Sequence, residues 1–415
     1  MTYLCLIAYV AAIYVRPAEI FPTWAGVPVV EILSALTFAV AGFSYLATPR
    51  KFWDLPHDRF VVGVWAAIVA SDLVSGWYGG AFRGFVYFSK IAFFYFLIRF
   101  AVRNQRHLAG FIAAICAANL FLALNGIVQF HTGTAFGGIP LNKGRVQGAG
   151  IFNDPNDLAL TLLMVVPFLL SEATDAVRGL VSRAAALVML VPIVVAILYT
   201  QSRGGVVGLA VILIASALQG RRKRGAVIVA GILGVAAAMV NASRLGMMDA
   251  SEESAQLRIQ AWKAALGMVK SHPLFGVGYD RFSEFHEHVA HNSFVHTLAE
   301  LGLVGAFVWT GMCYWLFKAL LPRRVQIGST KIDHWRDCVL LSAMGVLASS
   351  CFLSQQFGFV LYTLVGIGAC YASIAKTEGA DIQLYTSSRD LKLILGITLG
   401  GIVVTFLAVR ILAST

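Results

Sequence analysis

The sequence predicts an all-α polytopic membrane protein. Of its 415 residues, 58% are hydrophobic and only 13% are charged, whereas soluble domains carry about a quarter charged residues. Apolar runs near the roughly 20 residues needed to cross a hydrocarbon core recur along most of the chain. These runs show no two-residue alternation, and backbone groups in lipid must be satisfied within their own segment, so we expect helices and not barrel strands.

We expect about twelve or thirteen spanning helices, the first of them short. The expected spans are 4–15, 27–47, 60–78, 85–102, 108–129, 157–170, 184–199, 205–218, 226–240, 294–320, 338–353, 358–373 and 391–411. The chain then divides into three regions. Residues 1–240 carry spans one to nine with a loop at 130–156, residues 241–292 form a large loop with an amphipathic helix, and residues 293–415 carry the remaining spans.

The small polar content excludes several classes of protein. The six cysteines lie in or beside apolar runs without a CxxC pair or Cys/His ligand spacing, so neither a disulfide framework nor a zinc site is expected. The net charge of +11 comes from basic residues spread over short loops, which argues against a nucleic-acid partner. The first span runs into Arg16 and Pro17 without a cleavage pattern, and we expect it to remain as an anchor.

Clustered Lys and Arg residues indicate the orientation. With a cytoplasmic N-terminus, the even-numbered connections hold the basic clusters, such as Arg221 to Arg224, and the positive-inside rule then places the odd-numbered connections outside. The two long loops, 131–156 and 241–292, would therefore face the periplasm. Loops of this length in a compact protein are usually functional or disordered.

The first motif runs from Gly144 to Asp157, directly before a span. Its glycines permit close backbone approach, and Asn153, Asp154 or Asn156 can cap the following helix. A turn with a helix cap explains the segment by itself. Arg145 adds the possibility of a phosphate or sugar contact.

The second motif is Thr200-Gln201-Ser202-Arg203-Gly204-Gly205, a polar break between two apolar spans. A tight outward turn accounts for the glycines, while Arg203 at a membrane boundary requires an anionic partner or a snorkelling path. Arginine suits bidentate phosphate contact, and the amides at the start of the next helix would point the same way.

The third motif lies in the large loop. Residues 254–269 have apolar side chains at helical spacing, which predicts an amphipathic helix lying against the protein. Arg258 and Trp262 are four residues apart and would share one flank of that helix. A solvated arginine on a surface helix is the plainer interpretation.

The fourth motif contains four histidines, of which His291 and Asn292 stand where a long span begins. A helix N-terminus disfavours the imidazolium, so His291 would be a neutral base near physiological pH. Interfacial hydrogen bonding explains His286 and His288, and a metal site is not favoured. Glu300 is expected to give structural support. Gly302 and Gly305 would let another helix approach closely.

Taken in order, these motifs resemble the O-antigen ligase family. His291-Asn292, nine residues, Gly302, two residues and Gly305 resemble its signature, and the Arg258 segment and the Arg203 turn resemble the stretches that precede it. The resemblance implies a GT-C-like membrane glycosyltransferase that needs neither metal nor nucleotide cofactor. It implies that His291 is the catalytic base and that Arg203 and Arg258 bind the donor diphosphate, and we expect Arg145 to contribute to donor binding. Supporting roles would fall to Asn292, Gln201, Trp262, Glu300 and Asn153.

The resemblance also implies the substrates. The donor would be O-antigen linked to undecaprenyl diphosphate, the acceptor would be the lipid A core oligosaccharide, and the site would face the periplasm from the bacterial inner membrane. A polymerase of lipid-linked glycan and a ligase that transfers glycan to protein share the same features. A transporter or flippase is the alternative from another class, with Glu300 and Lys90 as coupling groups, although no paired repeat is visible.

Overall fold

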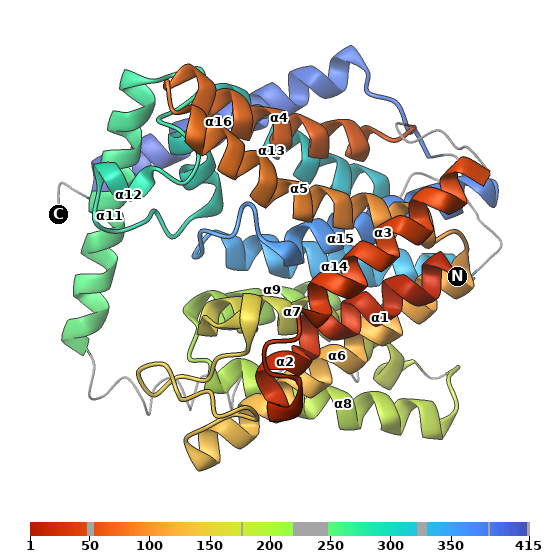
Figure 1. Cartoon of the computed structure of the whole chain (residues 1–415). Helices are drawn as coiled ribbons and strands as arrows, with labels where there is room; N and C mark the ends of the chain where they lie inside the picture. Colours follow the sequence, from red (N-terminus) through yellow and green to blue (C-terminus); the bar gives the residue numbers. More distant parts are fainter. Residues whose placement is uncertain (48–53, 176, 219–247, 322–329, 381, 413–415) are drawn as a thin grey trace.

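A computed structural model describes the chain except residues 48–53, 176, 219–247, 322–329, 381 and 413–415 (Figure 1). The described residues form helices and two isolated β-bridges, with no strand among them. The helices that correspond to expected spans are α1 (Thr2–Val15), α3 (Val29–Ala47), α4 (Pro56–Val74), α5 (Tyr78–Ala101), α6 (Gln105–Thr132), α7 (Pro155–Thr174), α8 (Leu180–Tyr199), α9 (Arg203–Leu218), α13 (Ser293–Leu320), α14 (Thr330–Ser350), α15 (Phe359–Thr377) and α16 (Ser388–Leu412).

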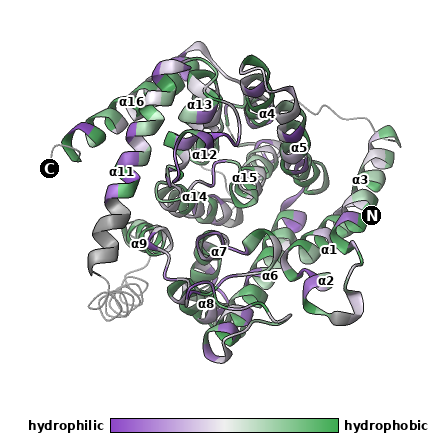
Figure 2. Ribbon diagram, turned by 60° about the vertical axis from the view of Figure 1, so that its left-hand side comes forward, coloured by the Kyte–Doolittle hydropathy of each residue, from purple (hydrophilic) through white to green (hydrophobic). Residues whose placement is uncertain are grey.

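This set confirms the predicted class, an all-α polytopic membrane protein. Within the described ranges, nine helices are long and apolar enough to cross a membrane, and α9 is a shorter apolar helix. The expected span at 226–240 lies outside the described residues. Figure 2 shows hydrophobic residues along the helices of the bundle, while α11 (Met248–Ser271) alternates hydrophilic and hydrophobic residues.

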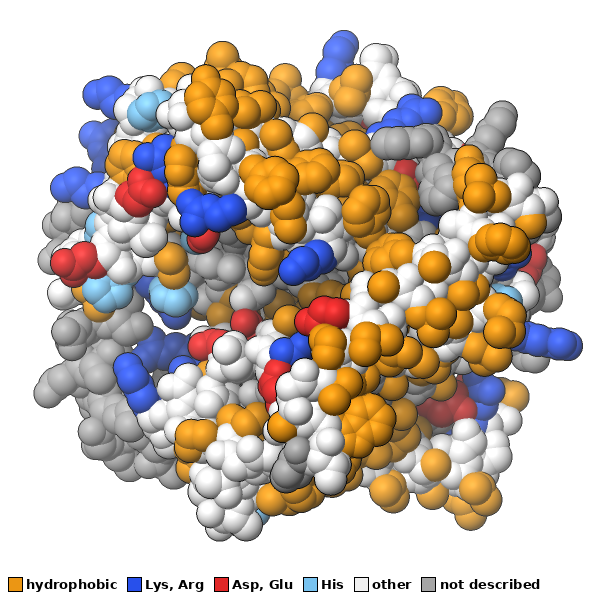
Figure 3. Space-filling view, viewed as in Figure 1, with side chains coloured by type: hydrophobic (Ala, Val, Ile, Leu, Met, Phe, Trp, Pro, Cys, Tyr) orange, Lys and Arg blue, Asp and Glu red, His pale blue; other side chains and the backbone are white. Residues whose placement is uncertain are grey.

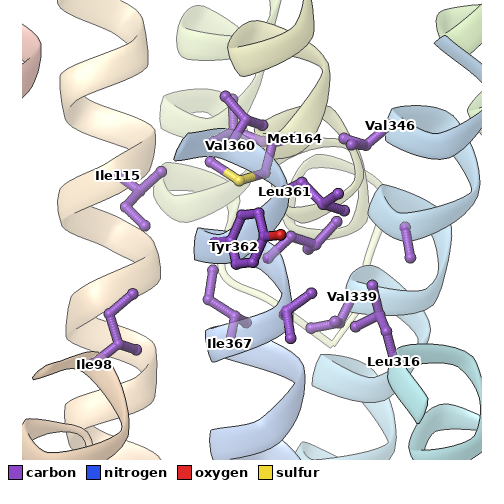
Figure 4. Close-up of a cluster of buried hydrophobic side chains, with 14 of the residues drawn as sticks. Ile98, Ile115, Met164, Leu316, Val339, Val346, Val360, Leu361, Tyr362 and Ile367 are labelled. Atoms are coloured by element: carbon purple, nitrogen blue, oxygen red, sulfur yellow. The ribbon is translucent and has the colours of Figure 1, made fainter. Parts of the chain in front are cut away.

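The core of the bundle is built around α15, most of which is buried. Tyr362 on α15 is fully buried and is surrounded by apolar side chains from several other helices (Figure 4). These neighbours include Ile98 of α5, Met164 of α7 and Leu316 of α13. Apolar packing on all sides of α15 holds the surrounding helices in one bundle.

The connections divide between the two ends of the bundle. In Figure 1 the N-terminus lies at one end, and the loops that follow α1, α6, α8 and α11 gather at the other. Helix α11 runs across that second end, at a steep angle to the bundle helices, and packs on α13 and α16. The amphipathic helix expected at 254–269 is therefore present and is longer than predicted.

Candidate functional site

His291 stands in an uncommon backbone conformation at the start of α13. Its φ is +45°, in the left-handed region that non-glycine residues rarely adopt. The next residue, Asn292, caps the helix, and its Oδ1 accepts hydrogen bonds from the amides of Phe294 (3.0 Å) and Val295 (3.1 Å). The cap thus fixes the point at which His291 leaves the helix axis.

The surroundings of His291 favour its neutral form. Burial lowers the pKa of this imidazole from its ordinary value, and the positive charge of Arg258 lowers it further. Asp154 opposes the shift, while His296 and His288 add to it. Because an unperturbed histidine titrates near 6.5, His291 is uncharged at neutral pH and is able to accept a proton.

Arg258 reaches the site from α11. Trp262, one turn further along, donates its indole N–H to the carbonyl of Ala290 at 2.8 Å, which ties α11 to the residue before His291. The Arg258 guanidinium lies 5.9 Å from the centroid of the Phe352 ring. Burial lowers the pKa of Arg258, and so does the charge of Arg203. Arg258 is thus half-buried and close to a second cation.

Arg203 is the first residue of α9 and is exposed. The turn before it contains Gln201 with a φ of +51°, and Ser202 Oγ accepts a hydrogen bond from the Gly205 amide at 3.1 Å. The glycines do not form this turn, contrary to the sequence-based expectation. A Cβ on Gly204 would lie 3.0 Å from Ser349 Oγ and 3.3 Å from Phe352 Cβ, so this glycine lets α9 approach the end of α14.

Arg145 is bound to the Arg203 turn. Its Nε donates to the Thr200 carbonyl at 2.9 Å, and one terminal nitrogen donates to Asn156 Oδ1 at 3.1 Å. Ser202 donates to the same Asn156 oxygen at 2.8 Å. Burial lowers the pKa of Arg145, Asp154 raises it and Arg203 lowers it. Arg145 therefore combines a structural contact with a charge close to Arg203.

The capping residue of α7 is Asp154, one of the three that the sequence allowed. Its Oδ1 accepts a hydrogen bond from the Asn156 amide at 2.7 Å. Asn153 is exposed at the end of the short 3-10 helix η2 (Gly150–Phe152). Asp154 influences the pKa of both Arg145 and His291, which brings an acidic side chain close to the cationic site.

The loop between α14 and α15 connects these elements and was missed by the sequence analysis. Ser293, at the start of α13, donates to the Leu353 carbonyl at 2.7 Å and accepts from the Gln355 amide at 3.0 Å. The Gln355 side chain donates to Asp157 of α7 at 2.5 Å. The available signal was Ser354-Gln355-Gln356, a polar break between two apolar spans like the one at Arg203.

Glu300 is buried in α13 at 2% exposure. Its Oε1 lies 3.0 Å from His296 Nε2 and accepts a hydrogen bond from the Phe282 amide at 3.2 Å. Phe282 begins the short helix α12 (Phe282–Phe285), which precedes the histidines. These contacts hold the large loop against α13.

Gly302 breaks α13, with a φ of +63° and a ψ of −161°. The backbone of the preceding loop enters the break: the amides of Val277 and Gly278 donate to the carbonyls of Ala299 and Glu300, each at 3.1 Å. The expectation that Gly302 and Gly305 admit another helix is therefore wrong. A Cβ on Gly302 would meet loop backbone, and one on Gly305 would meet Leu301 of its own helix.

His286 and His288, the other loop histidines of the fourth motif, bond to each other. His286 accepts a hydrogen bond from the His288 amide at 3.2 Å, and His288 is exposed. Among the described residues, no three His, Cys, Asp or Glu side chains are placed to hold a metal ion.

The structure thus brings Arg145, Arg203, Arg258 and His291 to one end of the bundle, where the charge of Arg203 lowers the pKa of Arg145 and of Arg258, and the charge of Arg258 lowers that of His291. Figure 3 shows a hollow at this end of the molecule, with Lys or Arg, His and acidic side chains around it. A site of this kind can hold an anion between its arginines while a neutral imidazole accepts a proton beside it.

Comparison with protein families gives a match in the part of the chain that carries these motifs. The family described as O-Antigen ligase matches residues 184–310, a stretch that contains Arg203, Arg258 and His291. None of the curated proteins compared with the chain matches it. The match covers residues 184–310 of the 415-residue chain and, with the ordered motifs within it, supports assignment of this region to the O-antigen ligase family.

Proposed function

We propose that this protein is a glycan ligase that transfers O-antigen from undecaprenyl diphosphate to the lipid A core oligosaccharide. The observation that carries the proposal is the placement of a neutral His291 beside Arg258, which is itself close to Arg203. The family assignment supports a glycosyl-transferring enzyme of the membrane. The choice of ligase, donor and acceptor is our inference.

The arginines would bind the diphosphate of the donor. The charge of Arg203 lowers the pKa of both Arg258 and Arg145, so like charges repel one another here. An anion between them removes this repulsion, and the planar guanidinium group matches phosphate oxygens in a bidentate manner. Because Arg145 already donates to Thr200 and Asn156, we assign the main contacts to Arg203 and Arg258.

The reaction follows from these positions. An acceptor hydroxyl attacks the anomeric carbon of the donor sugar, a new C–O bond forms, and the bond from that carbon to the diphosphate breaks. His291 takes the hydroxyl proton, a contribution of about 10² to 10⁴ in rate, and the arginines stabilise the charge that develops on the leaving diphosphate. A single displacement inverts the anomeric centre, and the scheme requires neither a metal nor a nucleotide.

The site would face the periplasm from the inner membrane. This assignment rests on the loop charges, which place the N-terminus in the cytoplasm. The motif-bearing loops and α11 lie at the end of the bundle away from the N-terminus (Figure 1). A lipid-linked donor would then present its sugar to His291 from the outer leaflet.

A transporter fits the polar residues less well. Lys90 is exposed on α5, whereas Glu300 is buried and bound to His296 and the Phe282 amide. Lys90 and Glu300 therefore do not line a common path through the interior of the bundle, as coupling groups of a transporter would.

The test is transfer by the purified protein in detergent, with lipid-linked O-antigen as donor and a lipid A core glycolipid as acceptor. We expect product without any ion gradient, and a loss of about 10² or more with His291→Gln. His272→Gln, an exposed histidine near the end of α11, is the matched control and should keep full activity. Lengthened lipid-linked glycan would indicate a polymerase, and an active His291→Gln protein would remove His291 from the mechanism.

A further inference from the structure

A second polar surface lies where α4 ends and α5 begins. The indole ring of Trp77 has the Arg83 guanidinium carbon 4.6 Å from its centroid and the Arg281 guanidinium carbon at 5.3 Å. A Cβ on Gly80 would lie 2.1 Å from the same ring, so the backbone of α5 supports it. Trp77 is thus a fixed aromatic centre beside two planar cations.

The loop that follows α11 completes this surface. The Tyr279 amide donates to Asp72 Oδ1 at 2.8 Å, which anchors the loop to α4. Asp280 is exposed and has a φ of +59°, and Arg281 pairs with Glu284 at 2.7 Å. Burial and Glu300 raise the pKa of Asp280, while His296 and Arg83 lower it, so Asp280 is within electrostatic reach of Arg83.

This surface and the arginine site lie on different sides of the same loop. In Figure 2, α12 lies between α4 and α5 on one side and α7 and α9 on the other. The Phe282 amide of α12 donates a hydrogen bond to Glu300, and the centroid of the Phe282 ring lies 4.9 Å from that of His296. His296 follows His291 by five residues. Phe282 thus links the loop that carries Arg281 to α13, the helix that begins just after His291.

The charge on the surface favours a neutral ligand over an anion. Two arginines, Arg83 and Arg281, are balanced by two carboxylates, Asp280 and Glu284. Sugar hydroxyls donate and accept hydrogen bonds, so they pair with both kinds of charged group, and aromatic side chains offer an apolar face. Tyr78 and Phe82 beside the surface are 72% and 70% exposed, as expected where helices leave the membrane.

We infer that the surface formed by Trp77, Arg83, Tyr279, Asp280 and Arg281 binds the sugar residues of the acceptor glycolipid. The inference rests on the proposed function, since it names the place of the acceptor in the same reaction. It separates the two substrates: the donor diphosphate lies among the arginines of α9 and α11, the acceptor sugars lie at the start of α5, and His291 stands between them.

The first test is equilibrium binding, which does not depend on turnover. The probe is deacylated lipid A core oligosaccharide, titrated into the purified full-length protein by calorimetry. Asp280→Asn preserves size and tolerates a positive φ, and Arg83→Gln changes an exposed side chain. Each should weaken binding about tenfold, the loss of one hydrogen bond to a charged group. Lys90→Gln, an exposed residue further along α5, is the control and should bind as the wild type does.

Unchanged affinity in both variants, or no binding by the wild type, would overturn the inference. The inference would also be overturned if the variants still bind the oligosaccharide but no longer bind vesicles of phosphatidylglycerol, because the surface would then hold lipid headgroups.

The second test is steady-state transfer. The Michaelis constant for the acceptor should rise about tenfold in the variants, and the Michaelis constant for the donor should not change. A wild type that binds the oligosaccharide and transfers nothing contradicts the proposed function alone. Variants that transfer with an unchanged acceptor constant contradict the inference alone.

Discussion

Gly302 and Gly276 lie against each other at the break in α13. A Cβ on Gly302 would be 2.5 Å from the Gly276 nitrogen, and a Cβ on Gly276 would be 2.3 Å from the Glu300 carbonyl carbon. The amide of Leu303 donates to the Pro273 carbonyl at 2.9 Å, so groups freed by the break are bonded to the loop. The two glycine motifs therefore form one interlocked unit that fixes the end of the large loop after α11 against α13.

Replacing Gly302 by alanine should destabilise the protein. The φ and ψ of this residue fall in a region open almost only to glycine, where a side chain costs about 1–3 kcal/mol, and the added carbon would also meet loop backbone. We expect a lower apparent melting temperature in detergent and loss of activity. Gly400→Ala on α16 is the control, since its Cβ would meet nothing within 4 Å; equal stability of the two variants would contradict the interlock.

The pH dependence of transfer should report His291. Because its pKa lies below the ordinary value, the neutral form persists as the pH falls, and kcat/KM should decline only below about pH 6.5. Arg258→Gln removes a positive neighbour, which raises the pKa and moves the acid limb to higher pH. Asp154→Asn keeps a capping residue and removes a negative neighbour, so the limb should move to lower pH. Shifts of the same sign in both variants would show that His291 is not the titrating group.

Lysine substitutions should separate charge from geometry in donor binding. Arg203→Lys and Arg258→Lys keep a positive charge but lose the bidentate fork. We expect the Michaelis constant for the lipid-linked donor to rise about tenfold in each, as for one lost charge-assisted hydrogen bond. The control is Arg389→Lys, an exposed arginine at the start of α16. An unchanged Michaelis constant for the donor in both lysine variants would contradict bidentate contact, because a positive charge without the fork would then be enough to bind the diphosphate.

Thiol labelling of intact cells should report the orientation. In a Cys351→Ser background, which removes the exposed cysteine of the α14–α15 loop, a cysteine at Gln201 should react with a membrane-impermeant maleimide. A cysteine at Arg389 should react only after the membrane is opened. The reverse pattern would place the site in the cytoplasm and exclude a periplasmic ligase.

Most of the helices were predictable because burial in lipid leaves a strong compositional signal. Expected spans such as 294–320 and 358–373 differ from α13 and α15 by at most four residues at their ends. The break at Gly302 was not predictable, since its sequence continues an apolar helix without interruption. It depends on the Gly276 loop, which supplies the backbone partners that the unwound turn requires.

The site was predictable as a set of motifs and not as an arrangement. Arg203, Arg258 and His291 each stood in a polar segment at a membrane boundary, where a charge or histidine is conspicuous. Phe352 and Gln355 gave weaker signals, because the sequence of a short loop between two spans does not indicate which other loops it contacts. The same holds for Trp77 and Arg281, whose contact joins residues about 200 positions apart.

By itself the sequence determined that this chain is a helical membrane protein and predicted which polar residues are candidates for its site, because lipid solvation and side-chain chemistry act on local segments. The tertiary structure decided which of those groups meet. Helix α11 crossing the end of the bundle brings Arg258 to His291, close packing of Gly204 against α14 brings Arg203 to the same place, and the interlocked glycines hold the loop after α11 against α13. Each of these depends on contacts between segments far apart in the chain, which no local pattern encodes.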